Sequence, residues 1–203
     1  MDGIDGEGTE ASGITLIGGN TADVEFVDTY KLGTVKFTKA GLYKESCAEN
    51  PDDVKMLDGV EFALYEGTDT ECENPVMTAT SVNGVVTFKD LKIGTYLVKE
   101  SKTIGDYIID NTVYTAEVTE ANIDTYAVLN GVQDNTLIND LPRTDLKIEK
   151  VAEENNGIKL PNSVYGLYKE NENGEEEFVA KATTDSNGVL KFDGILIGTE
   201  YTI

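Results

Sequence analysis

The chain of 203 residues contains no histidine and no tryptophan, and it has only 2 cysteines, 3 methionines and 4 prolines. Histidine is the commonest general base and the commonest metal ligand in proteins. Its absence argues against a turnover enzyme, although carboxylates can still act as acids and bases. The sequence therefore predicts neither a metal site nor a cofactor site.

Basic residues are also scarce. The chain has 16 Lys and Arg against 38 Asp and Glu, which gives a formal net charge of −22 and a pI near 4.1. Nucleic acids and anionic membrane surfaces attract Lys and Arg, so neither is an expected partner. No apolar run is long enough to cross a bilayer, and this segment is not expected to insert into a membrane. The acidity fits a solvated surface that keeps the protein soluble.

The two cysteines leave two interpretations open. Cys47 and Cys72 both stand in polar stretches that are expected to be loops. An even number of cysteines in an extracellular protein permits a disulfide between these loops, whereas two incidental free thiols are the alternative. The sequence does not give the separation of the two Cα atoms, which decides whether a bridge can form.

The sequence contains an internal repeat. The stretch from Val24 to Lys39 returns in altered form from Thr136 to Lys150. In each copy an Asp or Asn that ends an apolar run precedes a Lys by eleven positions, and these pairs are Asp28 with Lys39 and Asn139 with Lys150. The two copies are separated by the length of one ordinary domain.

Two further stretches repeat in the same order. Leu57–Gly67 matches Leu160–Glu170, and Thr80–Val98 matches Thr184–Ile203. The repeats predict three parts: a disordered lead with the closing strands of a preceding unit over 1–31, a complete domain over 32–141, and a second domain over 142–203 that is truncated at its C-terminus. A linker is expected around Pro142. We expect the chain to be a piece of a longer array.

The local pattern is β throughout. Short runs rich in Val, Ile, Thr, Tyr and Phe alternate with polar residues and are separated by Gly, Asn and Asp. Asn83-Gly84 and Asn187-Gly188 are dipeptides typical of hairpin turns. No stretch shows a sustained helical period, so the expected fold is an antiparallel β-sandwich. Three tyrosines in phase with apolar neighbours are expected in the core: Tyr65, Tyr96 and Tyr107.

Strand phase selects the candidate reactive residues. Residues two apart in a strand share a face, so Lys39 lies on the apolar face of its strand and Lys36 lies on the opposite face. Glu100 and Asn139 are also in phase with apolar residues of their own strands. An amine, a carboxylic acid and a carboxamide are thus predicted to face one interior. Lys36 is the alternative nucleophile, and a rim lysine that snorkels to solvent is the alternative interpretation of Lys39.

Three such groups in one core can react with one another. Burial favours the uncharged forms of acids and amines, and an uncharged Lys39 amine would be a nucleophile. It would attack the side-chain carbonyl of Asn139, with Glu100 moving the proton, and ammonia would leave. An Asp acceptor such as Asp28 would release water instead. The product is an amide bond between side chains.

The ordered set of motifs resembles a known family. GTVKFTK with Lys39, LDGVEFALY, NGVVTFKDLKIGTYLVKES with Glu100, GDY with Tyr107 and LIND with Asn139 together resemble the collagen-adhesin B-type (Cna-B) or SpaA-like pilin domain of Gram-positive surface proteins. The resemblance implies an all-β fold of tandem prealbumin-like, inverse Ig-type sandwiches. It also implies that the Lys, Glu and Asn form a self-catalysed isopeptide bond. The chain departs from the family in SKTIGDY, where an alanine-proline usually precedes the GY motif.

The resemblance assigns the two members of each repeated pair to different domains. Asp28 closes one unit and Lys39 opens the next, so Lys39 is expected to reach forward to Asn139 and not back to Asp28. Lys150 would open the following unit. Asp28 and Lys150 are therefore partial sites of neighbouring units.

The expected function is structural. The sequence favours a stalk segment of a cell-surface adhesin or pilus-like protein, extracellular and either cell-wall-anchored or secreted. Its partners would be neighbouring repeats of the same polypeptide, and its only chemistry would be one autocatalytic turnover. Two alternatives are a module that binds a host extracellular-matrix protein or a glycan through its loops, and a β-sandwich spacer of a secreted enzyme.

Overall fold

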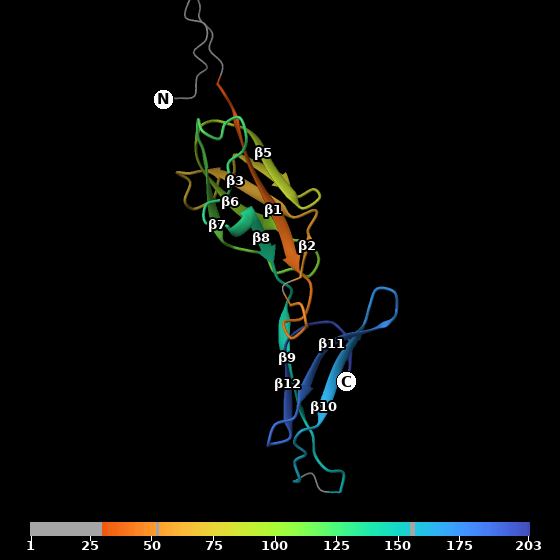
Figure 1. The fold of residues 1–203 in the computed structure, drawn as a ribbon. Helices are drawn as coiled ribbons and strands as arrows, with labels where there is room; N and C mark the ends of the chain where they lie inside the picture. The colour runs from red at the N-terminus through yellow and green to blue at the C-terminus, as the bar shows by residue number, and fades with distance from the viewer. Residues whose placement is uncertain (1–29, 52, 155–156) are drawn as a thin grey trace, which may run out of the picture. The chain divides into compact units, whose positions relative to one another are not determined.

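The computed structural model describes residues 30–51, 53–154 and 157–203 (Figure 1). They form two compact units. The first contains the described residues up to Thr38 together with Asp58–Lys102 and Asn111–Leu137. The second contains the described residues of Lys39–Leu57, Thr103–Asp110 and Ile138–Ile203. The predicted closing strands before residue 30, and Asp28 with them, lie outside the described residues.

Eight strands lie between Gly33 and Asn139. They are β1 (Gly33–Leu42), β2 (Val54–Met56), β3 (Glu61–Glu66), β4 (Met77–Thr80), β5 (Val85–Leu91), β6 (Gly94–Lys102), β7 (Val113–Val118) and β8 (Thr136–Asn139), with a short 3-10 helix at Gln133–Asn135. One sheet has the order β2-β1-β5, and β8 also pairs with β1. A second sheet has the order β4-β3-β6-β7.

Three phenylalanines form the centre of the first unit. Val35 and Phe37 alternate with exposed Lys36 on β1, so one face of the strand is apolar. The ring of Phe37 meets Phe62 of the other sheet edge-on, with centroids 4.9 Å apart, and lies 6.5 Å from the ring of Phe88. Burying each ring stabilises the fold by about 2 kcal/mol or more. The predicted sandwich is confirmed, and the three tyrosines expected in the core are buried.

The two Asn-Gly turns differ in conformation. Asn83 and Gly84 both have positive φ, at 50° and 71°, and Val82 and Val85 exchange two backbone hydrogen bonds across them. This is the two-residue hairpin that the dipeptide predicts. In the second turn only Gly188 has positive φ, and the Asp185 carboxylate accepts hydrogen bonds from the Asn187 and Val189 amides. The Asp side chain therefore shapes the second turn.

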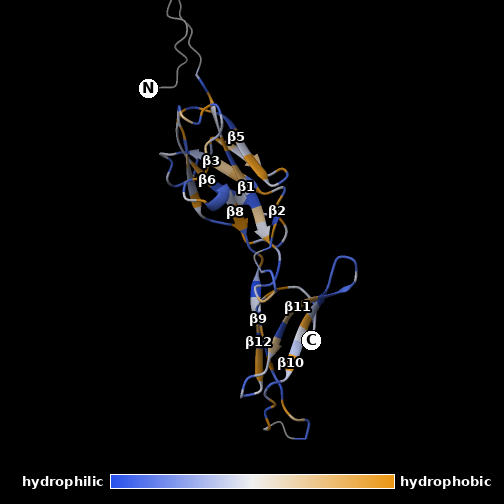
Figure 2. Cartoon of the chain, viewed as in Figure 1, coloured by the Kyte–Doolittle hydropathy of each residue, from blue (hydrophilic) through white to orange (hydrophobic). Residues whose placement is uncertain are grey.

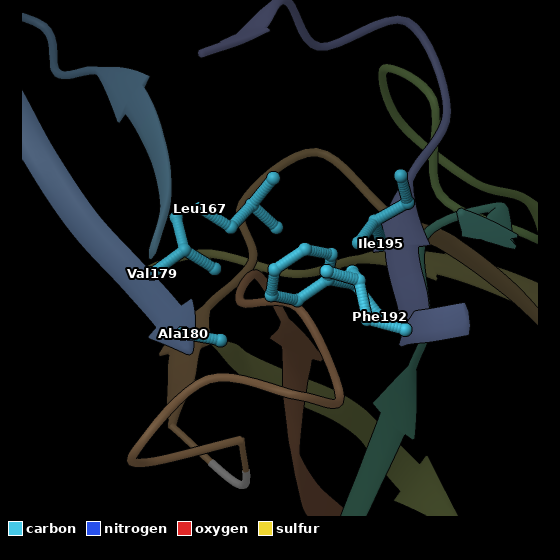
Figure 3. Close-up of a cluster of buried hydrophobic side chains, with 6 residues drawn as sticks. Leu167, Val179, Ala180, Phe192 and Ile195 are labelled. Carbon is cyan, nitrogen blue, oxygen red and sulfur yellow. The ribbon is translucent and has the colours of Figure 1, made fainter. Parts of the chain in front are cut away.

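Five further strands belong to the second unit. They are β9 (Arg143–Glu149), β10 (Val164–Glu170), β11 (Glu176–Thr183), β12 (Val189–Leu196) and β13 (Tyr201–Thr202). One sheet has the order β11-β10-β13, and β12 pairs with β9. Their buried side chains form one cluster, which consists of Leu167, Val179, Ala180, Leu190, Phe192 and Ile195. Figure 3 shows Leu167, Val179 and Ala180 across this cluster from Phe192 and Ile195. Cys47 and Ala48, from the segment after β1, also pack against this cluster.

The pairs β1–β5, β3–β4, β9–β12 and β10–β11 are antiparallel, and no α-helix occurs among the described residues. The all-β fold class is thus confirmed. In Figure 2 the connection between β10 and β11 is hydrophilic, as its run of acidic residues requires. No helix in the described part of the chain is long and apolar enough to span a membrane. The domain boundaries at 32–141 and 142–203 stay a prediction.

Candidate functional site: a buried lysine–asparagine pair

The structure brings Lys39 and Asn139 together. Lys39 Nζ donates a hydrogen bond to Asn139 Oδ1 over 2.5 Å, and the two residues are 0% and 2% exposed. Lys39 lies on β1 and Asn139 ends β8, the strand that pairs with β1. Strand phase turns both side chains inward, and the pairing of the strands sets them side by side. A lysine with its amine fully buried requires such a partner.

Thr103 holds the other end of the amide. Asn139 Nδ2 donates to Thr103 Oγ1 over 3.1 Å, which directs Oδ1 to Lys39. Thr103 follows the last residue of β6. The amide nitrogen, which would leave as ammonia in a crosslinking reaction, is therefore held away from the incoming amine. Strand phase does not point to Thr103, and its only sequence signal is a hydroxyl three residues after Glu100.

Glu100 is also buried. It lies on β6, opposite Phe62 of β3, and is 2% exposed. Its neighbour Lys99 points the other way and is more exposed. The predicted inward phase of Glu100 is thus observed. Glu100 belongs to the first compact unit, while Lys39 and Asn139 belong to the second.

Tyr107 packs against the backbone of β1 close to Lys39. Its side chain is 9% exposed, and a Cβ added to Gly41 would lie 2.4 Å from its ring. Gly41 is two positions after Lys39 and shares its face. Burial, with a smaller contribution from the charge of Asp140, raises the pKa of the Tyr107 hydroxyl. The GDY motif therefore supplies a ring that covers the inward face of β1 beside the lysine.

Lys36, the alternative nucleophile, lies outside the core. It is exposed, and its amine is 5.3 Å from the centroid of the Tyr126 ring, a cation–π contact. The phase argument, which favoured Lys39 over Lys36, agrees with this placement. Lys150, which takes the place of Lys39 in the following repeat, is half-buried, and its backbone amide donates to the Gly188 carbonyl.

The two cysteines are free thiols in this structure. Cys47 packs against the cluster around Phe192, whereas Cys72 packs against Ala63, Tyr65 and Leu97. Cys47 belongs to the second compact unit and Cys72 to the first, and a disulfide between them stays a prediction. Among the described residues, no group of three or more Asp, Glu or Cys side chains is arranged to hold a metal ion.

The chain belongs to the SpaA family of prealbumin-like fold domains, whose model matches residues 49–132 and 144–203. Each matched segment falls within one of the two repeats seen in the sequence. This family consists of pilin-type structural domains, and the chain therefore contains Cna-B/SpaA-like domains in tandem. No curated protein matches the chain.

The chain is similar to several solved structures. The Bacillus anthracis TIE protein is 28% identical over 88% of the chain, with a TM-score of 0.51; the chain spans 30% of that protein. A streptococcal ancillary pilin is 16% identical over 85% of the chain and 54% of its own length, with a TM-score of 0.38. The shaft pilin SpaA of Lactobacillus rhamnosus GG is 15% identical over 84% of the chain and 86% of its own length, with a TM-score of 0.38.

Proposed function

We propose that this chain is a stalk segment of an extracellular surface protein, and that a Lys39–Asn139 isopeptide bond stiffens it. The observation that carries the proposal is the buried contact between the Lys39 amine and the Asn139 carbonyl oxygen. A charged amine in such a place costs several kcal/mol. An amide bond between the two side chains removes that charge and keeps both residues in place.

The reaction would proceed in two steps. Uncharged Lys39 Nζ attacks Asn139 Cγ as the uncharged Glu100 carboxyl gives its proton to the Asn139 side-chain oxygen, and the resulting carboxylate accepts the proton that the amine loses. The Cγ–Nδ2 bond then breaks, and Glu100 returns the proton to the departing nitrogen, which leaves as ammonia. Thr103 Oγ1, which accepts from Nδ2, orients the leaving group. Glu100 takes its first proton back from the oxygen as the carbonyl re-forms, so it ends in its original state and one turnover needs no added reagent.

The mechanical consequence follows from the strand order. β1 opens the repeat and β8 closes it, and the two strands pair. A covalent bond between them would carry a force applied along the chain, which otherwise loads the hydrogen bonds of this strand pair. The partners of this stalk segment would be neighbouring repeats of the same polypeptide. The whole protein would be cell-wall-anchored or secreted. Membership of a pilin-type structural family supports this role.

The test is the intact mass of the purified chain under denaturing conditions. The expected mass is that of the sequence less one ammonia, and fragmentation should place the link between Lys39 and Asn139. The link must persist in denaturant, because an amide bond does not depend on the fold. An unmodified mass would overturn the proposal, as would ammonia loss that fragmentation assigns to another pair.

A further inference from the structure

The segment that follows β1 is built into the second unit. We call residues Lys44–Ala48 the strap. The repeat pattern assigns the strap to the repeat that starts at residue 32, but its residues belong to the compact unit that contains β9–β13. Cys47 and Ala48 pack against the cluster around Phe192. The strap therefore contributes to a core whose other members come from the following repeat.

Backbone contacts fix the strap in place. The Ser46 amide donates to the Gly194 carbonyl over 2.9 Å, and the Arg143 guanidinium donates to the Lys44 carbonyl. Gly194 has φ of +60°, and a Cβ at this position would lie 2.5 Å from the Ser46 hydroxyl. Only glycine allows this approach. Arg143 also forms an ion pair with Asp140. The same guanidinium therefore contacts both the strap and the predicted linker around Pro142.

Glu45 is the most deeply buried member of the strap. It is 1% exposed, and its two carboxylate oxygens each lie 2.9 Å from Lys169 Nζ. The Tyr201 hydroxyl donates to Glu45 Oε1 over 2.8 Å. Lys169 comes from β10 and Tyr201 from β13, two paired strands of the second unit. The recess that receives Glu45 therefore presents one cation and one hydroxyl donor, a combination that fits a carboxylate.

The complete repeat has a different residue at the position that corresponds to Lys169. In the aligned motifs LDGVEFALYEG and LPNSVYGLYKE, Glu66 stands where the second repeat has Lys169. Glu66 is exposed, and its charge contributes, after burial, to a raised pKa of the Tyr96 hydroxyl. Tyr96 donates to the carbonyl of Lys92 and not to a carboxylate. The complete repeat thus keeps the tyrosine but replaces the cation with an acid, and an acidic strap would be repelled there.

We propose that the recess at Lys169 and Tyr201 is a docking site for an acidic loop of the preceding repeat, and that Glu45 is its occupant. Lys169 makes the site specific for a carboxylate. Because Glu66 occupies the equivalent position in the complete repeat, the two repeats accept different straps. Docking of the strap therefore specifies which repeat can precede residues 142–203. Docking of the strap does not require the isopeptide bond, and the residues that take part in it lie outside the Lys39–Asn139 site.

The test uses the full chain and follows the reaction of its two thiols with a maleimide under native conditions. Lys169→Met leaves Glu45 buried without its cation, so the strap should leave the recess and expose Cys47. Truncating one partner of a buried ion pair is strongly destabilising, and Cys47 labelling should accelerate at least about tenfold. Cys72, in a different cluster, is the internal reference and should keep its rate. Lys181→Met, an exposed lysine on β11, is the matched control.

The Lys169→Met variant distinguishes greater exposure of Cys47 from a change in the reactivity of its thiol. Burial first, and then the charge of Glu45, raise the pKa of the Cys47 thiol. Lys169→Met keeps the Glu45 charge, which raises the pKa of the Cys47 thiol and would by itself slow its reaction with maleimide. Faster labelling of Cys47 must therefore report greater exposure of this thiol. An unchanged Cys47 rate would overturn the proposal. Equal acceleration of Cys47 and Cys72, or equal acceleration by Lys181→Met, would also overturn it.

Charge reversal supplies a second test, read by hydrogen exchange of the Ser46 amide. Glu45→Lys and Lys169→Glu should each raise the exchange rate of this amide, because each places two like charges together. The double variant restores one cation and one anion and should recover protection, at least about tenfold relative to either single variant. Failure of the double variant to recover would show that charge pairing does not hold the strap.

Discussion

The amine of Lys39 and the side-chain oxygen of Asn139 lie 2.5 Å apart in the protein interior, although 100 positions separate them in the chain. The contact joins the first strand of the complete repeat to its last. A hydrogen bond in this place links two segments, and a covalent bond would close nearly the whole repeat into one loop.

Replacing Lys39 with Ala should restore the full mass of the chain and lower its stability. A crosslink that closes a loop of about 100 residues stabilises a fold by roughly 4–5 kcal/mol, mainly by restricting the unfolded chain. Denaturant unfolding, monitored by tyrosine fluorescence, measures this loss. The matched control is Lys36→Ala, which removes an exposed amine and should change neither the mass nor the stability by more than about 0.5 kcal/mol. Equal effects of the two substitutions would argue against the crosslink.

Glu100→Gln should stop the reaction while leaving the amine and the amide in place. The variant keeps the size and polarity of the side chain but cannot accept and return a proton. General acid–base catalysis contributes a factor of about 100 to 10,000, so the chain should be isolated with its unmodified mass. A Glu100→Gln chain that lacks one ammonia after purification would assign the proton transfer to another group.

Thr103→Val should slow the reaction without preventing folding. The substitution keeps the branched shape but removes the oxygen that accepts from Asn139 Nδ2. Without this acceptor the amide can rotate, and its oxygen is no longer held towards Lys39. We expect the fraction of crosslinked chain to rise over hours in the variant, whereas the unaltered chain should be complete when purified. Mass spectra taken at intervals after synthesis measure the difference, and identical time courses would exclude an orienting role for Thr103.

Acid should release the strap. Burial alone would raise the pKa of the Glu45 carboxyl, but hydrogen bonds from Lys169 and Tyr201, together with the Lys169 charge, bring this pKa below the ordinary glutamate value of 4.5. A carboxyl with a lowered pKa in the folded state contributes stability that is fully present above pH 4.5. That stability is lost as the pH falls from 4.5 through the lower folded pKa.

Hydrogen exchange of the Ser46 amide as a function of pH, corrected for the intrinsic rate, measures this release. In Glu45→Gln the acid-dependent loss of protection should disappear. Glu49→Gln, which changes an exposed carboxylate next to the strap, should retain it. A pH profile that is the same in Glu45→Gln and in the unaltered chain would assign the titration to other carboxylates.

Features that depend on local pattern could be predicted from the sequence. The alternation of β1 follows from the two-residue period of a strand, and it is sufficient to place Lys39 inward and Lys36 outward. The repeat of whole motifs identified tandem domains, and the Asn83-Gly84 dipeptide identified a hairpin because both residues tolerate positive φ. These properties are encoded by neighbouring residues.

Only the tertiary structure decided which distant groups meet. Glu45 stands between Lys44 and Ser46 in a polar stretch typical of a solvated loop, yet it is buried because Lys169 and Tyr201, far along the chain, supply its partners. The contact of Thr103 with Asn139 and the placement of the two cysteines in separate clusters also depend on segments that are distant in the chain. Burial of a polar side chain depends on compensating groups brought by other segments. The sequence determined the strands and the direction of their side chains, and the tertiary structure decided the partner of each buried polar group.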